Sequence, residues 1–220
     1  MSVLRLAAPI GLAFLPLGMA LGFLVVHAGL AWWWAPVFAA VIYAGSLEFL
    51  MVGLAAAGAP VATVALTTLI VNSRHVFYAL SFPLHRVRSV PGKTYSTYVL
   101  SDEAFAVGVS PAARTWTSGQ ILAMQAGLHL TWTVSAAAGA LLGAALPIER
   151  LQGLEFALTA LFIVLAIDAS SQHPDPLTAL LAVACAVAAG LLAPGQMLVW
   201  AFTAFTALLF ARLLAERRGA

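Results

Sequence analysis

Residues 6–26 read LAAPIGLAFLPLGMALGFLVV, an apolar run that holds no charged residue. A helix of about 20 apolar residues crosses the hydrocarbon core of a bilayer, so this run is long enough to span. One arginine, Arg5, precedes it as in a signal peptide. The run exceeds the usual apolar core of a signal peptide, however, and further apolar segments follow at once. We therefore expect a first membrane helix here.

Composition extends this interpretation to the whole chain. Of its 220 residues, 63% are hydrophobic and 8% are charged, whereas a soluble domain has about 25% charged residues. The apolar residues suffice for roughly seven spans. A soluble globular protein, a disordered chain and a nucleic-acid binder are excluded, and the one cysteine, Cys185, allows no intrachain disulfide and no Cys-based metal cluster. We predict an all-α polytopic membrane protein that forms a single transporter domain over residues 1–220.

Seven further apolar segments follow the first run, and one of them is short. They cover residues 35–57, 61–80, 95–109, 119–146, 154–167, 177–192 and 197–214. Two glycine pairs, Gly18 with Gly22 and Gly139 with Gly143, have the small-xxx-small spacing that lets helices approach closely. Each pair predicts a tight contact with a neighbouring helix.

The positions of the basic residues predict the orientation, because Lys and Arg collect on the cytoplasmic side. Two basic clusters should both be cytoplasmic, so an even number of crossings must separate them. Five apolar segments lie between the clusters, so one of them does not cross, or one cluster breaks the rule. The short segment 95–109 is the best candidate, entering the membrane and returning, which gives about seven crossings with the N-terminus outside. The clusters are Arg86, Arg88 and Lys93, and Arg212, Arg217 and Arg218.

Polar and charged residues inside apolar segments are the candidate functional residues. A charge at the centre of a membrane helix costs about 2.5–3.5 kcal/mol, so such a group faces protein or water and usually has a purpose. We expect substrate binding or coupling by Glu48, Asn72, Arg74, His75, Asp102, Glu103 and Asp168.

Structural roles for the same residues remain open. Arg74 can neutralise Glu48 or Asp102 as an ion pair that holds the bundle together. Asp102 and Glu103 repel each other, so one of them tends to keep a proton in a low-dielectric site, which suits proton exchange. Alternatively, both acids are solvated at the end of their segment. His75 can relay protons, or it is a hydrogen-bonded packing residue.

Sequence motifs of soluble enzymes are absent from the chain. It contains no GxxxxGK[ST] phosphate loop, no HExxH and no GxSxG. We therefore expect no enzymatic activity, no cofactor and no metal.

Four stretches carry a resemblance to a known family. They are IYAGSLEFL from Ile42, LTTLIVNSRHVFYALSF from Leu66, LSDEAFAV from Leu100 and GLEFALTALFIVLAIDA from Gly153, with a looser fit for HLTWTVSAAAGALLG from His129. The chain resembles the AzlC family, the large subunit of a bacterial branched-chain amino acid permease. The resemblance implies transport, generally export, of branched-chain amino acids, with a small hydrophobic partner of the AzlD type.

We thus expect a multi-pass subunit of a secondary transporter in the bacterial inner membrane. Its ligands would be the lipid bilayer and an amino acid, with no nucleic acid. Arg74, or a half-helix end near 11–22, would take the substrate carboxylate, and Glu48 the ammonium. Protons moving through Asp102, Glu103 or His75 would supply the energy. A non-transporting membrane scaffold and a passive amino-acid channel are the alternatives.

Overall fold

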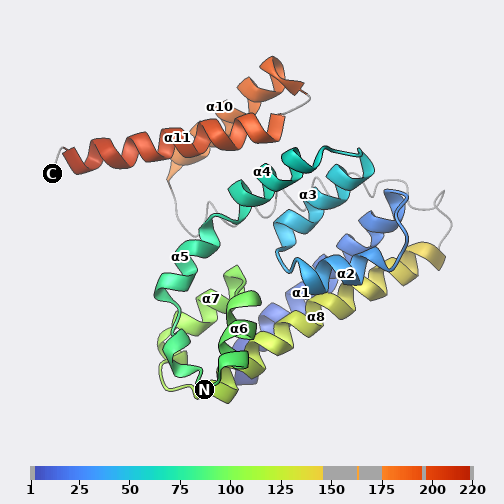
Figure 1. Cartoon of the computed structure of the whole chain (residues 1–220), viewed down its shortest axis with the longest axis vertical. Helices are drawn as coiled ribbons and strands as arrows, with labels where there is room; N and C mark the ends of the chain where they lie inside the picture. Colours follow the sequence, from blue (N-terminus) through green and yellow to red (C-terminus); the bar gives the residue numbers. More distant parts are fainter. Residues whose placement is uncertain (1–2, 146–162, 164–174, 195–196, 219–220) are drawn as a thin grey trace. The chain divides into compact units, whose positions relative to one another are not determined.

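The computed structural model describes residues 3–145, 163, 175–194 and 197–218, and every regular element in them is helical (Figure 1). Of the predicted features, the segment 154–167 and Asp168 lie outside the described residues. The described chain divides into two units, Met1–Ala59 with Asn72–Arg150, and Pro60–Val71 with Leu151–Ala220. Each unit is considered by itself.

Two long helices, α1 (Val3–His27) and α8 (Ser118–Ala145), form the centre of the first unit. Pro9 and Pro16 lie inside α1 without ending it. Among the described residues, only these two helices are both long and apolar enough to cross a membrane. The predicted count of seven crossings therefore stays a prediction.

Glycines bring α1 and α8 into backbone contact. A Cβ atom on Gly22 would overlap the backbone of Ala136 and Ala140, and one on Gly139 would overlap the backbone of Met19. A Cβ atom on Gly18 would lie 2.6 Å from the Cβ of Ser135. The two predicted small-residue pairs are thus the two sides of one contact.

The register of this contact shows that α1 and α8 run in the same direction. Gly11 lies opposite Thr131, and Gly143 lies opposite Phe23, so residue numbers rise together along both helices. The N-terminus of α1 therefore lies at the end of the unit where α8 begins (Figure 1).

The basic loop lies at this same end. Arg86 donates to the carbonyl oxygen of Ala113 at 3.0 Å, just before α8 begins, and a Cβ atom on Gly92 would touch Leu122 of α8. The N-terminus and this loop thus lie at one end of the unit, whereas we had expected them on opposite sides of a membrane. The side on which this end lies stays a prediction.

The predicted helix 35–57 is interrupted. It consists of α2 (Trp34–Val41) and α3 (Gly45–Ala56), and Tyr43 between them has a positive φ of 46°. In Figure 1, α2 runs back along α8 and α3 turns again, leading away from the break in roughly the reverse direction. We had expected 35–57 to be one continuous helix.

The short segment 95–109 also divides into two helices, α6 (Val90–Tyr98) and α7 (Asp102–Val109). Gly92 of α6 lies by Leu122 of α8, and Tyr95 of α6 reaches His129 of α8. Residue numbers therefore rise together along the two helices, so α6 runs parallel to α8. The chain then breaks and returns, because α7 leads through η2 (Pro111–Ala113) to the start of α8. This path has the form predicted for a segment that enters and returns.

The predicted helix 61–80 is likewise two helices, α4 (Val61–Asn72) and α5 (Arg74–Ser81). The boundary between the two units falls between Val71 and Asn72, so α4 belongs almost wholly to the second unit and α5 to the first. The element η1 (Leu84–Arg86) follows α5.

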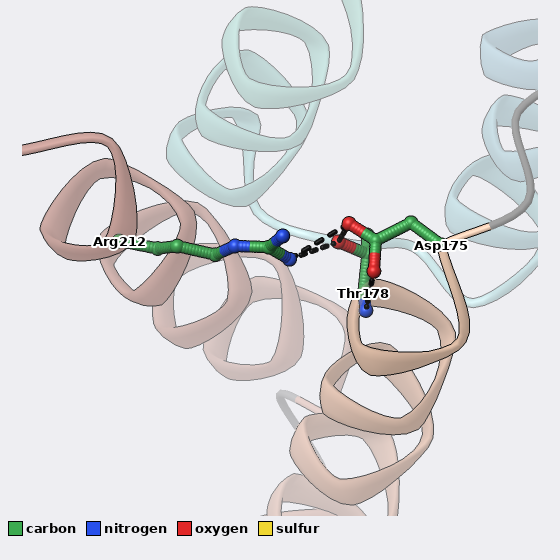
Figure 2. Close-up of polar contacts among 3 residues, drawn as sticks. All are labelled: Asp175, Thr178 and Arg212. Carbon is green, nitrogen blue, oxygen red and sulfur yellow. Dashed lines mark hydrogen bonds and ion pairs between the residues drawn. The ribbon is translucent and has the colours of Figure 1, made fainter. Parts of the chain in front are cut away.

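In the second unit, α10 (Pro176–Leu192) packs against α11 (Met197–Arg218). Asp175 caps α10 by accepting from the Thr178 amide at 3.2 Å and the Thr178 hydroxyl at 2.8 Å. Arg212 of α11 donates to the same carboxylate at 2.7 Å (Figure 2). The hydrogen bonds from Thr178, followed by the contact with Arg212, lower the pKa of Asp175 from its ordinary value.

Candidate functional site

The break between α2 and α3 lies against the break between α6 and α7. The Tyr98 hydroxyl, at the end of α6, shares its proton between the carbonyl oxygens of Ala40 at 2.5 Å and Val41 at 2.7 Å. These carbonyls belong to the last turn of α2, where backbone acceptors have no partner inside the helix. Tyr98 therefore fastens the end of one half-helix to the end of the other.

His129 of α8 holds the same two segments. Its Nε2 lies 3.1 Å from the carbonyl oxygen of Ala40, and its Nδ1 lies 3.2 Å from the Tyr95 hydroxyl. Because a carbonyl only accepts, Nε2 carries the proton, and a neutral ring then accepts from Tyr95 at Nδ1. These contacts give His129 a structural role.

Glu48 is fully buried at the start of α3. One carboxylate oxygen accepts from the backbone N–H of Ala44 at 2.8 Å, and Trp132 Nε1 lies 3.1 and 3.0 Å from the two oxygens. The Trp132 ring in turn packs edge-on against Phe14 of α1, with ring centroids 5.2 Å apart. Glu48 thus joins the break to both central helices.

Tyr43, at the break itself, has a buried side chain with 6% of its surface exposed. Its ring centroid lies 4.5 Å from that of His129. The hydroxyl lies near Ser101 and within electrostatic reach of Glu103, yet it makes no hydrogen bond of normal geometry with any described residue. A buried phenol without a bond is unusual, because such groups are almost always paired.

The adjacent acids begin α7. Ser101 caps this helix by accepting from the Ala104 amide at 3.3 Å. Asp102 accepts from the Tyr78 hydroxyl at 2.8 Å, and Tyr78 stacks on Phe105 with ring centroids 4.4 Å apart. Negative charge is favourable at a helix N-terminus, so both Asp102 and Glu103 suit this first turn.

The model of the AzlC protein family matches residues 9–146 of the chain. The chain belongs to the AzlC family. The matched region runs from α1 to α8 and so contains both breaks.

Named relatives agree with this assignment. The chain is 29% identical to the branched-chain amino acid transport protein AzlC of Bacillus subtilis, over 87% of this chain and 76% of that protein. It is 31% identical to an uncharacterized membrane protein of Helicobacter pylori, over 80% and 78% of the two chains. It is 27% identical to the inner membrane protein YgaZ of Escherichia coli, over 70% and 66%. No solved structure matches the chain.

This AzlC-family chain is therefore a membrane protein of a transport-associated family. Its predicted site residues fall into two groups. Glu48 and Glu103 both lie within electrostatic reach of Tyr43, and Asp102 begins the same helix as Glu103. The side chain of Arg74 is outside the described part of the structure, so the ion pairs predicted for it stay predictions.

The remaining predicted residues lie on the segment between α3 and α6. Asn72 ends α4, and its Oδ1 is buried without a hydrogen bond to a described residue. His75 of α5 packs edge-on against Tyr78, with ring centroids 5.4 Å apart. The described residues contain no group of three His, Cys, Asp or Glu side chains arranged to hold a metal.

Sequence analysis missed the aromatic residues that join the breaks. Tyr95 and Tyr98 were assigned only to an apolar segment, and Trp132 only to a motif. No local pattern identifies their partners, because the hydrogen bonds of Tyr98 and Trp132 reach residues 58 and 84 positions away.

Proposed function

We propose that this chain is a subunit of a secondary transporter that exports branched-chain amino acids across the bacterial inner membrane. The observation that carries the proposal is the meeting of two interrupted helix pairs beside α8. Interrupted helices inside a membrane are tolerated where the exposed backbone lines a cavity or is buried in protein, and transporters use them to bind substrates and ions. The relative named as a branched-chain amino acid transport protein supports the choice of substrate.

The proposed transporter couples export to protons. Transport against a gradient requires energy, and the sequence contains no nucleotide-binding motif. Asp102 and Glu103 are the proposed coupling residues because they are adjacent acids at the break between α6 and α7. Of the two, we favour Asp102, whose short side chain is held by Tyr78.

The proposed roles of the other residues follow from their contacts. Glu48 accepts hydrogen bonds from Ala44 and Trp132, which favours a positioning role over binding of the substrate ammonium. We had expected a half-helix end near 11–22 to bind the substrate carboxylate. Because α1 is continuous from Val3 to His27, we propose the helix ends at the two breaks for this role instead. Asn72, Arg74, His75 and Asp168 stay candidates for binding or relay. A small hydrophobic AzlD-type subunit completes the proposed transporter.

The test is amino-acid efflux from cells loaded with leucine-containing dipeptides, with and without the chain and its AzlD-type partner. We expect faster efflux of leucine, isoleucine and valine when both subunits are present. Collapse of the proton gradient should stop these amino acids from accumulating outside the cells. Flux that ignores the gradient would indicate a passive channel instead. Unchanged efflux with normal expression of both subunits would indicate a scaffold and overturn the proposal.

The coupling residues are tested in vesicles with an imposed pH gradient. Asp102→Asn should stop gradient-driven accumulation while exchange of internal for external leucine continues, because the amide cannot release a proton. Glu103→Gln is the matched control. If both variants respond to the gradient as the unmodified chain does, neither acid couples transport to protons.

A further inference from the structure

We propose that the carboxylate of the transported amino acid binds between the first turns of α3 and α7, where the Tyr43 hydroxyl donates a hydrogen bond to it. This inference rests on the proposed function and names the residue that recognises one end of its substrate.

Each break presents helix ends of both signs at one place. The last turns of α2 and α6 offer carbonyl groups with partial negative charge, whereas the first turns of α3 and α7 offer N–H groups with partial positive charge. Tyr98 and His129 bind carbonyls in the last turn of α2 and so hold the breaks together. A zwitterion, with one carboxylate and one ammonium a few bonds apart, matches this arrangement better than a simple ion does.

Tyr43 provides the independent indication of a ligand. The side chain is 6% exposed, and its hydroxyl lacks a hydrogen bond of normal geometry among the described residues. The hydroxyl lies near Ser101, the cap of α7, while the backbone of Tyr43 leads directly into α3. The phenol therefore connects the two half-helix starts and carries a proton that a bound group can accept.

The backbone of Tyr43 supports the same role. Its φ of 46° lies in the left-handed region, which is uncommon for a residue with a bulky side chain. Such a conformation persists where the surroundings impose it, and it is concentrated at binding sites. Glycine would adopt this conformation at no steric cost, but it would lack the hydroxyl.

Two of the acids near Tyr43 already accept hydrogen bonds from protein groups. The Glu48 carboxylate is matched by the N–H groups of Ala44 and Trp132, and the Asp102 carboxylate is matched by the Tyr78 hydroxyl. Glu103 lies within electrostatic reach of Tyr43, so it would attract the ammonium of a zwitterion that the Tyr43 hydroxyl binds.

The experiment compares leucine with leucinol, which keeps the ammonium and the side chain but lacks the carboxylate. Binding of both is measured for the purified full chain with its AzlD-type partner, for Tyr43→Phe and for Tyr95→Phe. Tyr95→Phe is the matched control, because it removes a phenol hydroxyl that already has a partner in His129. We expect Tyr43→Phe to weaken leucine about 10- to 100-fold, the effect of losing a hydrogen bond to a charged group, while leucinol binding is unchanged. Tyr95→Phe should change the affinities for the two ligands by the same factor.

Three outcomes overturn the inference, and they are distinguishable. If the unmodified protein binds and exports leucine but Tyr43→Phe keeps the leucine-to-leucinol ratio, only the inference fails. It also fails if Tyr43→Phe lowers the melting temperature of the ligand-free protein as much as Tyr98→Phe does, because the hydroxyl then has a structural partner. If the unmodified protein neither binds nor exports leucine, isoleucine or valine, the proposed function fails together with the inference.

Discussion

Trp132 of α8 donates its indole N–H to Glu48 at the start of α3, with Nε1 lying 3.1 and 3.0 Å from the two carboxylate oxygens. The bond joins residues 84 positions apart inside the protein. It supports the chain where the helix is interrupted, because the same carboxylate also holds the Ala44 N–H.

We predict that Glu48→Gln and Trp132→Phe are coupled in stability. Trp132→Phe leaves the buried Glu48 carboxylate without its side-chain donor, and Glu48→Gln places an NH2 group, itself a donor, beside the Trp132 N–H. Each change should cost about 1–3 kcal/mol. The double variant should therefore be less destabilised than the sum of the singles, by about 1 kcal/mol. Thermal unfolding of the four proteins in detergent measures this coupling. Trp116→Phe is the control, because the buried Trp116 Nε1 has no hydrogen bond to a described residue, and its effect should add to that of Glu48→Gln.

The contact between α1 and α8 predicts opposite outcomes for two glycines of the same helix. Gly139→Ala would push a methyl group into the backbone of Met19, which should destabilise the protein by about 1–3 kcal/mol. Gly127→Ala meets nothing within 4 Å and should be neutral or stabilising by about 0.5–1 kcal/mol, because alanine favours a helix. The yield of detergent-stable protein and its melting temperature compare the two. Equal behaviour would argue against close backbone contact at Gly139.

Removal of the Tyr98 hydroxyl should weaken the junction between the breaks. Tyr98→Phe leaves the Val41 carbonyl without this donor, whereas the Ala40 carbonyl keeps its hydrogen bond with His129. Because Tyr98 is partly exposed, we expect a cost of about 0.5–1.5 kcal/mol. Tyr43→Phe removes a hydroxyl that has no hydrogen bond of normal geometry to a described residue, and it should leave the ligand-free melting temperature unchanged. A melting temperature for Tyr98→Phe equal to that of the unmodified protein would contradict the proposed junction.

The stability of the hairpin formed by α10 and α11 should depend on pH through the ionisation of Asp175. The pKa of this carboxyl is lowered in the folded protein, chiefly by the hydrogen bonds from Thr178. Its contribution to stability is therefore complete above its ordinary pKa of 3.8 and is lost as the pH falls through the lower folded value. Amide hydrogen exchange in the first turns of α10, corrected for intrinsic rates, measures the effect.

Asp175→Asn should speed that exchange at pH 7, and the difference from the unmodified chain should shrink as the pH falls below 3.8. Arg212→Gln should have a smaller effect, because both hydrogen bonds from Thr178 remain. A difference that is constant across this range would exclude the ionised carboxylate as its cause.

Particular residues show where sequence analysis succeeded and where it failed. Long apolar runs predicted α1 and α8, because hydrophobic length is a local property of the sequence. The break at Tyr43 was missed because neither glycine nor proline occupies that position, and tertiary contacts impose the positive φ. Acids such as Glu48 and Asp102 were recognised as unusual, but their partners Trp132 and Tyr78 could not be identified, because those contacts depend on the fold.

The parallel contact between α1 and α8 has a consequence for how the protein is made. The residues from His27 to Ala145 must be synthesised after α1 is complete and before α8 is. At about 5–20 residues per second, the 118 residues between these positions (145 − 27) take roughly 6–24 s. During that time Gly18 and Gly22 have no complete α8 to pack against. Until translation reaches Gly139, α1 lacks the residues that it contacts most closely, so a ribosome that stalls before Ser118 leaves a fragment without the principal packing partner of α1.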